Sequence, residues 1–190
     1  MKALGKDYEN AKASDGGYVT LPPGGYIAVI TFVEDVPFNP QTNKGDYLKV
    51  DFDICEGDFM DYFGDMRKRL GWDNGNFIRS YKESALGMFK GFLKAIDESN
   101  GTDFETMAAK GFNEKDLRGK KIGIIMGAEE YKKNDGSIGE RLRVTAVRSI
   151  ETIREGKYKI PDIKRLQESS SDAASRIIGG PISDNDIPFA

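Results

Sequence analysis

Histidine is absent from this sequence of 190 residues, and cysteine occurs once, at Cys55. Without histidine the chain lacks imidazole metal ligands, Ser-His pairs and the side chain that most often serves as a general base near neutral pH. A single cysteine excludes an intrachain disulfide and a thiolate metal cluster, which fits a reducing cytoplasm. Since no histidine can activate Cys55, we expect an inert thiol. We therefore expect a protein that is not an enzyme and that uses no cofactor or metal.

Long apolar runs are also missing. No stretch approaches the roughly 20 apolar residues of a membrane-spanning helix. The opening residues MKALGKDYENAK lack the apolar core of a signal peptide. Mean hydropathy is −0.52, and 38% of the residues are hydrophobic, so the chain is globular with a polar excess. Its length suits one domain with tails. These features predict a cytoplasmic protein with no membrane segment.

The charges are unevenly distributed along the chain. The net charge is −3, which at first argues against a nucleic-acid partner. Residues 168–190, however, contain four acids and one base, whereas residues 110–165 contain 15 bases and 9 acids, a net of +6. A basic region followed by an acidic tail indicates two surfaces with different partners.

Hydrophobic periodicity predicts five strands and one main helix. The strands are expected over residues 26–33, 47–54, 58–70, 121–128 and 141–150. The helix is expected to begin at Ser80, because Ser80 and Glu83 have the spacing of a capping box, and to end at Gly101. A small-residue stripe of Gly87, Gly91 and Ala95 predicts close packing of that helix against another part of the chain.

The order strand, strand, strand, helix, strand, strand is that of the OB-fold, a mainly β barrel with one main helix. In such barrels oligonucleotides bind to the face of strands two and three and to the loops after strands one and four, which are long in this sequence. We expect a flexible arm over residues 1–20, the OB-fold domain over 21–165, and a disordered linker with an acidic tail over 166–190.

Aromatic and basic residues are interleaved along the predicted binding surface. Aromatic rings stack on unpaired bases, and Lys and Arg neutralise phosphates. The candidate DNA-binding residues are Tyr47, Lys49, Arg67, Lys68, Arg69, Trp72, Tyr131, Lys132, Lys133, Arg141 and Arg143. The alternative is that Tyr47 and Trp72 cap the core and the basic residues form a solvated face.

Two further functions stay open at this point. Asp51 and Asp53 share one face of the predicted second strand, and Glu56, Asp58, Asp61 and Asp65 follow, so the acids could hold Mg²⁺ for phosphodiester cleavage. A nuclease is therefore one alternative. The other is an adaptor that binds proteins and no DNA.

The end of the chain resembles the acidic tip of bacterial single-stranded DNA-binding proteins (SSB). That tip is an acid run followed by Ile-Pro-Phe, and here Asp184 and Asp186 precede Ile187, Pro188 and Phe189. The bacterial tip ends on Phe, whereas Ala190 follows here. The resemblance implies that the five tail residues dock onto partner proteins.

A second resemblance covers roughly residues 18–165. The segments LPPGGYIAVI, YLKVDFDICEGDF and SYKESALGMFKGFLKAIDESN are similar to a family of phage- and prophage-encoded, OB-fold, SSB-like proteins of Gram-positive hosts. This resemblance implies a protein that coats and protects single-stranded DNA in replication and recombination. Recruitment of replication and recombination proteins would fall to the tail. Whether the protein forms a homo-oligomer is left open.

Overall fold

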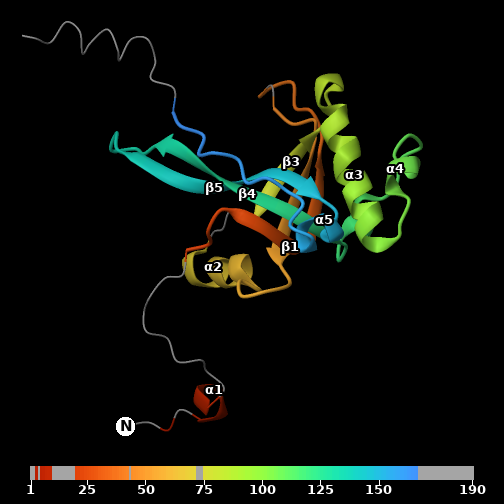
Figure 1. The fold of residues 1–190 in the computed structure, drawn as a ribbon. Coiled ribbons are helices and arrows are strands. Elements are labelled where there is room, and N and C mark those ends of the chain that lie inside the picture. Colours follow the sequence, from red (N-terminus) through yellow and green to blue (C-terminus); the bar gives the residue numbers. More distant parts are fainter. Residues whose placement is uncertain (1–2, 4, 10–19, 43, 72–74, 167–190) are drawn as a thin grey trace, which may run out of the picture.

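A computed structural model describes residues 3, 5–9, 20–42, 44–71 and 75–166 of the chain. This part of the chain is mainly β, with a five-stranded antiparallel sheet in the order β3-β2-β1-β4-β5 (Figure 1). The strands are β1 (Gly24–Val36), β2 (Tyr47–Ile54), β3 (Asn76–Ser80), β4 (Lys121–Lys132) and β5 (Ile138–Arg148). Because β1 pairs with both β2 and β4, strands β3 and β5 are the two edges of the sheet.

The described part of the chain also contains helices and two 3₁₀ turns. They are α1 (Gly5–Glu9), α2 (Tyr62–Leu70), α3 (Leu86–Asn100), α4 (Phe104–Met107) and α5 (Ile150–Arg154), with 3₁₀ turns η1 (Glu83–Ala85) and η2 (Glu114–Leu117). Helix α3 is the longest, and it lies between β3 and β4 in the sequence. Its residues Phe92, Leu93 and Ile96 are buried in the core. In the view of Figure 1, α2 and α3 lie apart with strands of the sheet between them.

The core follows from the alternation in β2. Leu48, Val50, Phe52 and Ile54 are buried, and the residues between them are half-buried. The Phe52 ring contacts Phe63 of α2 at 5.3 Å and Phe77 of β3 at 5.9 Å between centroids. One aromatic side chain of β2 therefore links the sheet to helix α2.

Residues 58–70 do not form the predicted third strand. They contain α2, which buries Phe63 and Met66 on one side, and the third strand is the later segment β3. The N-terminal N–H groups of α2 are satisfied from outside the helix. The Asp53 carboxylate accepts hydrogen bonds from the N–H groups of Phe63 (3.0 Å) and Gly64 (2.8 Å). The strand-and-helix order thus differs from the predicted one by an extra helix between β2 and β3.

The start and packing of the main helix also differ from the prediction. Ser80 is the last residue of β3, and α3 begins at Leu86, so Ser80 does not cap the helix. A Cβ added at Gly87 or Gly91 would meet nothing within 4 Å outside the helix backbone. The expected close packing of these two glycines is therefore wrong, whereas Ala95 is buried.

Strand β4 is buried on both faces from Ile122 to Ala128. Residues 157–166 lie across it after α5. Tyr158 covers Gly25, whose N–H donates a hydrogen bond to the Tyr158 hydroxyl (3.2 Å), and Pro161 lies against Gly127. Further on, the Lys164 N–H donates to the carbonyl of Ala128 (3.0 Å). This segment therefore fixes the base of the long β4–β5 hairpin.

Candidate nucleic-acid interface

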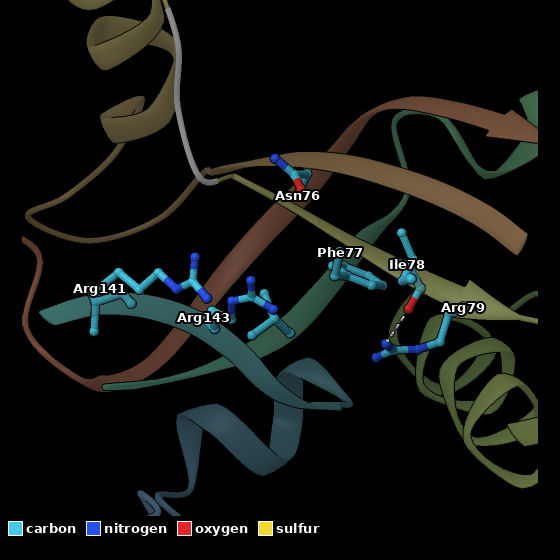
Figure 2. Close-up of a pocket in the computed structure, with 8 residues that line it drawn as sticks. Asn76, Phe77, Ile78, Arg79, Arg141 and Arg143 are labelled. Atoms are coloured by element: carbon cyan, nitrogen blue, oxygen red, sulfur yellow. Dashed lines mark hydrogen bonds between the residues drawn. The ribbon is translucent and has the colours of Figure 1, made fainter. Parts of the chain in front are cut away.

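The two edge strands of the sheet border a groove of about 350 Å³. Four consecutive residues of each strand line it: Asn76, Phe77, Ile78, Arg79, Arg141, Leu142, Arg143 and Val144. In Figure 2 the side chains of Arg141 and Arg143 reach from β5 into the space before β3, and Arg79 lies at the other end, beside a helix. The groove therefore has arginine at both ends and apolar side chains between them.

Arg141 and Arg143 were both predicted from the sequence, and the structure places them together. They are two residues apart on β5, so they share a face of the strand. Both lie near the Glu129 carboxylate of β4: Oε2 is 3.0 Å from Arg143 Nε and 3.7 Å from Arg141 Nε. The Arg143 side chain is 58% exposed, so it can reach a ligand.

Arg79 is a groove residue that the sequence analysis missed. Its guanidinium lies 4.4 Å from the centroid of the Phe77 ring and 5.7 Å from that of Phe92. Burial lowers the pKa of Arg79 to about 10, so the side chain remains charged at neutral pH. Its Nη1 donates to the carbonyl of Ile78 (2.9 Å), and its buried Nε donates to no described residue. Arg79 is therefore a charged side chain held by stacking on two aromatic rings.

Tyr131 of β4 is held beside the groove arginines. The guanidinium of Arg141 lies 5.1 Å from the centroid of its ring. The ring fits there because residue 139, opposite Tyr131 on β5, is glycine, and a Cβ at that position would press against the ring. Lys132 ends β4, and Lys133 begins the exposed turn of the hairpin. Three of the predicted residues thus lie near the tip of one hairpin.

Tyr47 and Lys49 lie on β2, next to β3. Lys49 is opposite Ile78 of β3, and its Nζ lies 3.5 Å from Asp51 Oδ1. Tyr47 borders a second hollow, formed by the loop between β1 and β2, which also contains Lys44 and the 53% exposed Phe38. Phe38 was also missed, although an exposed aromatic in a long loop between strands is a recognisable signal.

The remaining predicted residues do not line the groove. Arg67, Lys68 and Arg69 are exposed on the last turn of α2, where Lys68 pairs with Asp65 at 3.1 Å. Trp72 lies outside the described residues, and so do the tail residues Asp184, Asp186, Ile187, Pro188 and Phe189. Their roles stay predictions.

Several of the carboxylates behind the nuclease alternative have structural partners. Asp53 holds the start of α2, and burial raises its pKa despite three backbone N–H donors. Glu56 lies 2.9 Å from Lys121 Nζ and 3.0 Å from Arg154 Nη2, and these hydrogen bonds lower its pKa. Within the described ranges, no three His, Cys, Asp or Glu side chains are grouped so that they could hold a metal ion.

Neither protein-family profiles nor the sequences of characterised proteins gave a match to the chain. Among solved structures, one match is titled yeast RPA bound to ssDNA. Its TM-score is 0.28 and its identity 12%, over 90% of this chain and 94% of that chain. A TM-score this low does not establish a shared fold. None of the helices in the described part of the chain is long and apolar enough to cross a membrane.

Proposed function

We propose that this protein binds single-stranded DNA through the groove between β3 and β5 and carries out no chemistry on it. The observation that carries the proposal is the placement of Arg79, Arg141 and Arg143 around one groove with apolar walls. A phosphodiester backbone needs cations to neutralise it, and unpaired bases need apolar or aromatic surface. The groove offers both within a few residues.

The arrangement of the sheet supports an OB-fold. The strands run β3-β2-β1-β4-β5, and the longest helix follows the third strand in sequence. An OB-fold is a five-stranded, partly open barrel that binds oligonucleotides on strands two and three and in the loops after strands one and four. In this chain those regions carry Lys49, Ile78, Phe38 and Lys133.

We infer a binding mode in which each group has one task. The groove arginines hold phosphates, and the exposed ring of Phe38 and the half-buried rings of Tyr47 and Tyr131 stack on bases. None of these contacts reads the Watson–Crick edge of a base, so binding is independent of sequence. Duplex DNA hides the faces of its bases, so it loses the stacking contacts.

The wider role rests on the two resemblances in the sequence. We propose that the protein acts in the cytoplasm, coats DNA of a phage or prophage during replication and recombination, and recruits partner proteins through Asp184, Asp186, Ile187, Pro188 and Phe189. The net charge of −3 on residues 168–190 fits a tail that avoids DNA and binds proteins instead.

A titration of fluorescent oligo-dT with wild type, Arg143→Ala and Lys94→Ala tests the proposal. Lys94 is a matched control because it is exposed on α3 and does not line the groove, and its loss changes the net charge equally. We expect Arg143→Ala to weaken binding several-fold and Lys94→Ala to leave it nearly unchanged. Equal effects of the two variants would contradict the proposed site. Cleavage of the oligonucleotide in Mg²⁺ would favour the nuclease instead.

A further inference from the structure

Three cations from two separate segments converge on one carboxylate beside the groove. Arg141 and Arg143 of β5 lie near Oε2 of Glu129, as described above. The third cation is Lys164, whose Nζ lies 3.7 Å from Oε1 of the same carboxylate. The Glu129 side chain is 20% exposed, so the cluster is partly shielded from water.

The backbone determines this convergence. Arg141 is the cross-strand neighbour of Glu129, and Lys164 forms a parallel bridge with Glu129 from the other side of β4. Arg141 is also held by its contact with the Tyr131 ring. The cations are therefore positioned by strand pairing, and the carboxylate does not have to be present for the backbone to bring them together.

The three cations carry more positive charge than the Glu129 carboxylate neutralises. Three positive charges lie near the Glu129 carboxylate, and Asp162 lines the same hollow as Glu129 and Lys164, which leaves an excess of one. Arg141 Nε is buried and donates no hydrogen bond to any described residue. A phosphodiester carries one negative charge on two free oxygens, so like a carboxylate it can accept two hydrogen bonds from the fork of a guanidinium.

We propose that Arg141, Arg143 and Lys164 form a binding site for one phosphodiester group, and that the Glu129 carboxylate stands in for that phosphate in the unbound protein. This inference rests on the proposed function and adds Lys164, a residue outside the sheet, to the interface. To engage a phosphate, Arg143 turns from Glu129 within the hollow that Arg143 and Lys164 both line. Glu129 then repels the incoming anion, so it lowers the affinity for the strand.

The variant Glu129→Gln, which replaces the carboxylate by an uncharged amide of similar size, gives the sharpest test. Removing the competing carboxylate should tighten binding of fluorescent oligo-dT by about three- to tenfold at low salt, with a smaller gain at high salt because screening weakens the repulsion. Glu140→Gln is the matched control. It removes the same charge from the same hairpin, but strand alternation places Glu140 on the opposite face of β5 from Arg141.

Lys164→Ala tests the new ligand, with Lys94→Ala as its control. We expect weaker binding and a salt dependence of log K that is shallower by about 0.7, the value for one phosphate contact on a single strand. If Glu129→Gln binds no more tightly than Glu140→Gln, or if Lys164→Ala matches Lys94→Ala, the anion site is wrong. The proposed function would still stand, provided that wild type binds the oligonucleotide.

The anion site can also be tested without DNA. Inorganic phosphate should raise the melting temperature of the wild-type protein by more than that of Lys164→Ala. If wild type shows this shift yet binds no oligonucleotide, the anion site is supported and the proposed function fails. If phosphate protects the two proteins equally, the site is contradicted.

Discussion

At the scale of single residues, the groove depends on side chains whose neighbours limit their motion. Arg79 lies on the Phe77 and Phe92 rings, and Arg141 lies against Tyr131. A cation that is already ordered loses less side-chain entropy when it binds a phosphate. The same contacts make these arginines part of the packing, so their removal affects both stability and binding.

Arg79→Lys and Arg79→Ala separate these two contributions. Lysine keeps the charge and loses the planar stack, whereas alanine loses both. We expect Arg79→Ala to lower the free energy of unfolding by about 1–2 kcal/mol through lost cation–π contact and packing. Both variants should weaken oligo-dT binding, and alanine should do so more. Urea unfolding measures the change in stability, and a titration with oligo-dT measures the change in affinity. If both variants bind oligo-dT as tightly as wild type, Arg79 is not part of the binding site.

Two glycines give opposite predictions for the same change. A Cβ at Gly25 would collide with the Tyr158 ring, whereas a Cβ at Gly91 would enter open space. We therefore expect Gly25→Ala to destabilise the fold by about 1–3 kcal/mol through overpacking. Gly91→Ala should stabilise it by about 0.5–1 kcal/mol, because glycine in a helix interior is entropically costly. Thermal unfolding of both variants checks the pair. A stable Gly25→Ala would show that the Tyr158 ring does not pack tightly on Gly25.

At the scale of elements, α2 is held by a strand that precedes it. Asp53 of β2 binds two of its first N–H groups, and Asp61 at the N-cap position makes no side-chain capping bond. The acids that suggested a metal site from the sequence thus include one that supports a helix. This assignment gives Asp53 a role in stability.

Asp53→Ala should therefore act on folding. Loss of the carboxylate leaves the N–H groups of Phe63 and Gly64 without this acceptor, and we expect a cost of about 1–3 kcal/mol. Asp51→Ala is the control on the same face of β2, since the Asp51 carboxylate forms an ion pair with Lys49 at 3.5 Å. Equilibrium urea unfolding gives both values. Equal stability of Asp53→Ala and wild type would refute the capping role.

The sequence predicted those elements in which one pattern is strong. Strands β1, β2, β4 and β5 have long alternating or fully apolar runs, and α3 has apolar residues three and four apart. Strand β3 has five residues, of which only Phe77 is buried, so its sequence shows no hydrophobic alternation that would predict a strand. In α2 the buried residues Phe63 and Met66 are three apart, a helical spacing that was interpreted as a strand.

The same limits apply to the candidate site. Arg141 and Arg143 were predictable because strand alternation puts them on one face of β5. Arg79 was missed together with β3. The pairing of Lys164 with Glu129 joins residues far apart in sequence through a single parallel bridge, and no local pattern encodes such a contact. Local periodicity thus identifies strand faces, but it does not identify which distant segments meet.

At the scale of the whole molecule, the chain has a basic region within the domain and an acidic region at its end. Residues 110–165 supply Arg141, Arg143 and Lys164, and residues 168–190 carry a net charge of −3. The acidic tail follows a segment that contains Ser and Gly, and it carries a negative charge, as DNA does. It should therefore compete weakly with a strand for the cations, and salt should screen that competition.

Deletion of residues 183–190 tests the tail. We expect unchanged melting temperature, oligo-dT affinity that is unchanged or slightly higher at low salt, and loss of binding to replication and recombination proteins, because Ile187 and Phe189 are the apolar anchors of the tail. Removing Ala190 alone should strengthen docking if the partner requires a carboxylate on Phe189. Equal capture of partners by the full chain and the deletion would show that the tail is not a docking signal.

The most direct test of the central claim compares single-stranded with duplex DNA. Fluorescence anisotropy would follow labelled oligo-dT and a labelled duplex of equal length over a series of salt concentrations. We predict tighter binding of the single strand, with log K falling by about 2–3 per decade of salt if three or four phosphates are neutralised at about 0.7 each. Equal affinity for the duplex, or no binding of either DNA at low salt, would contradict the account.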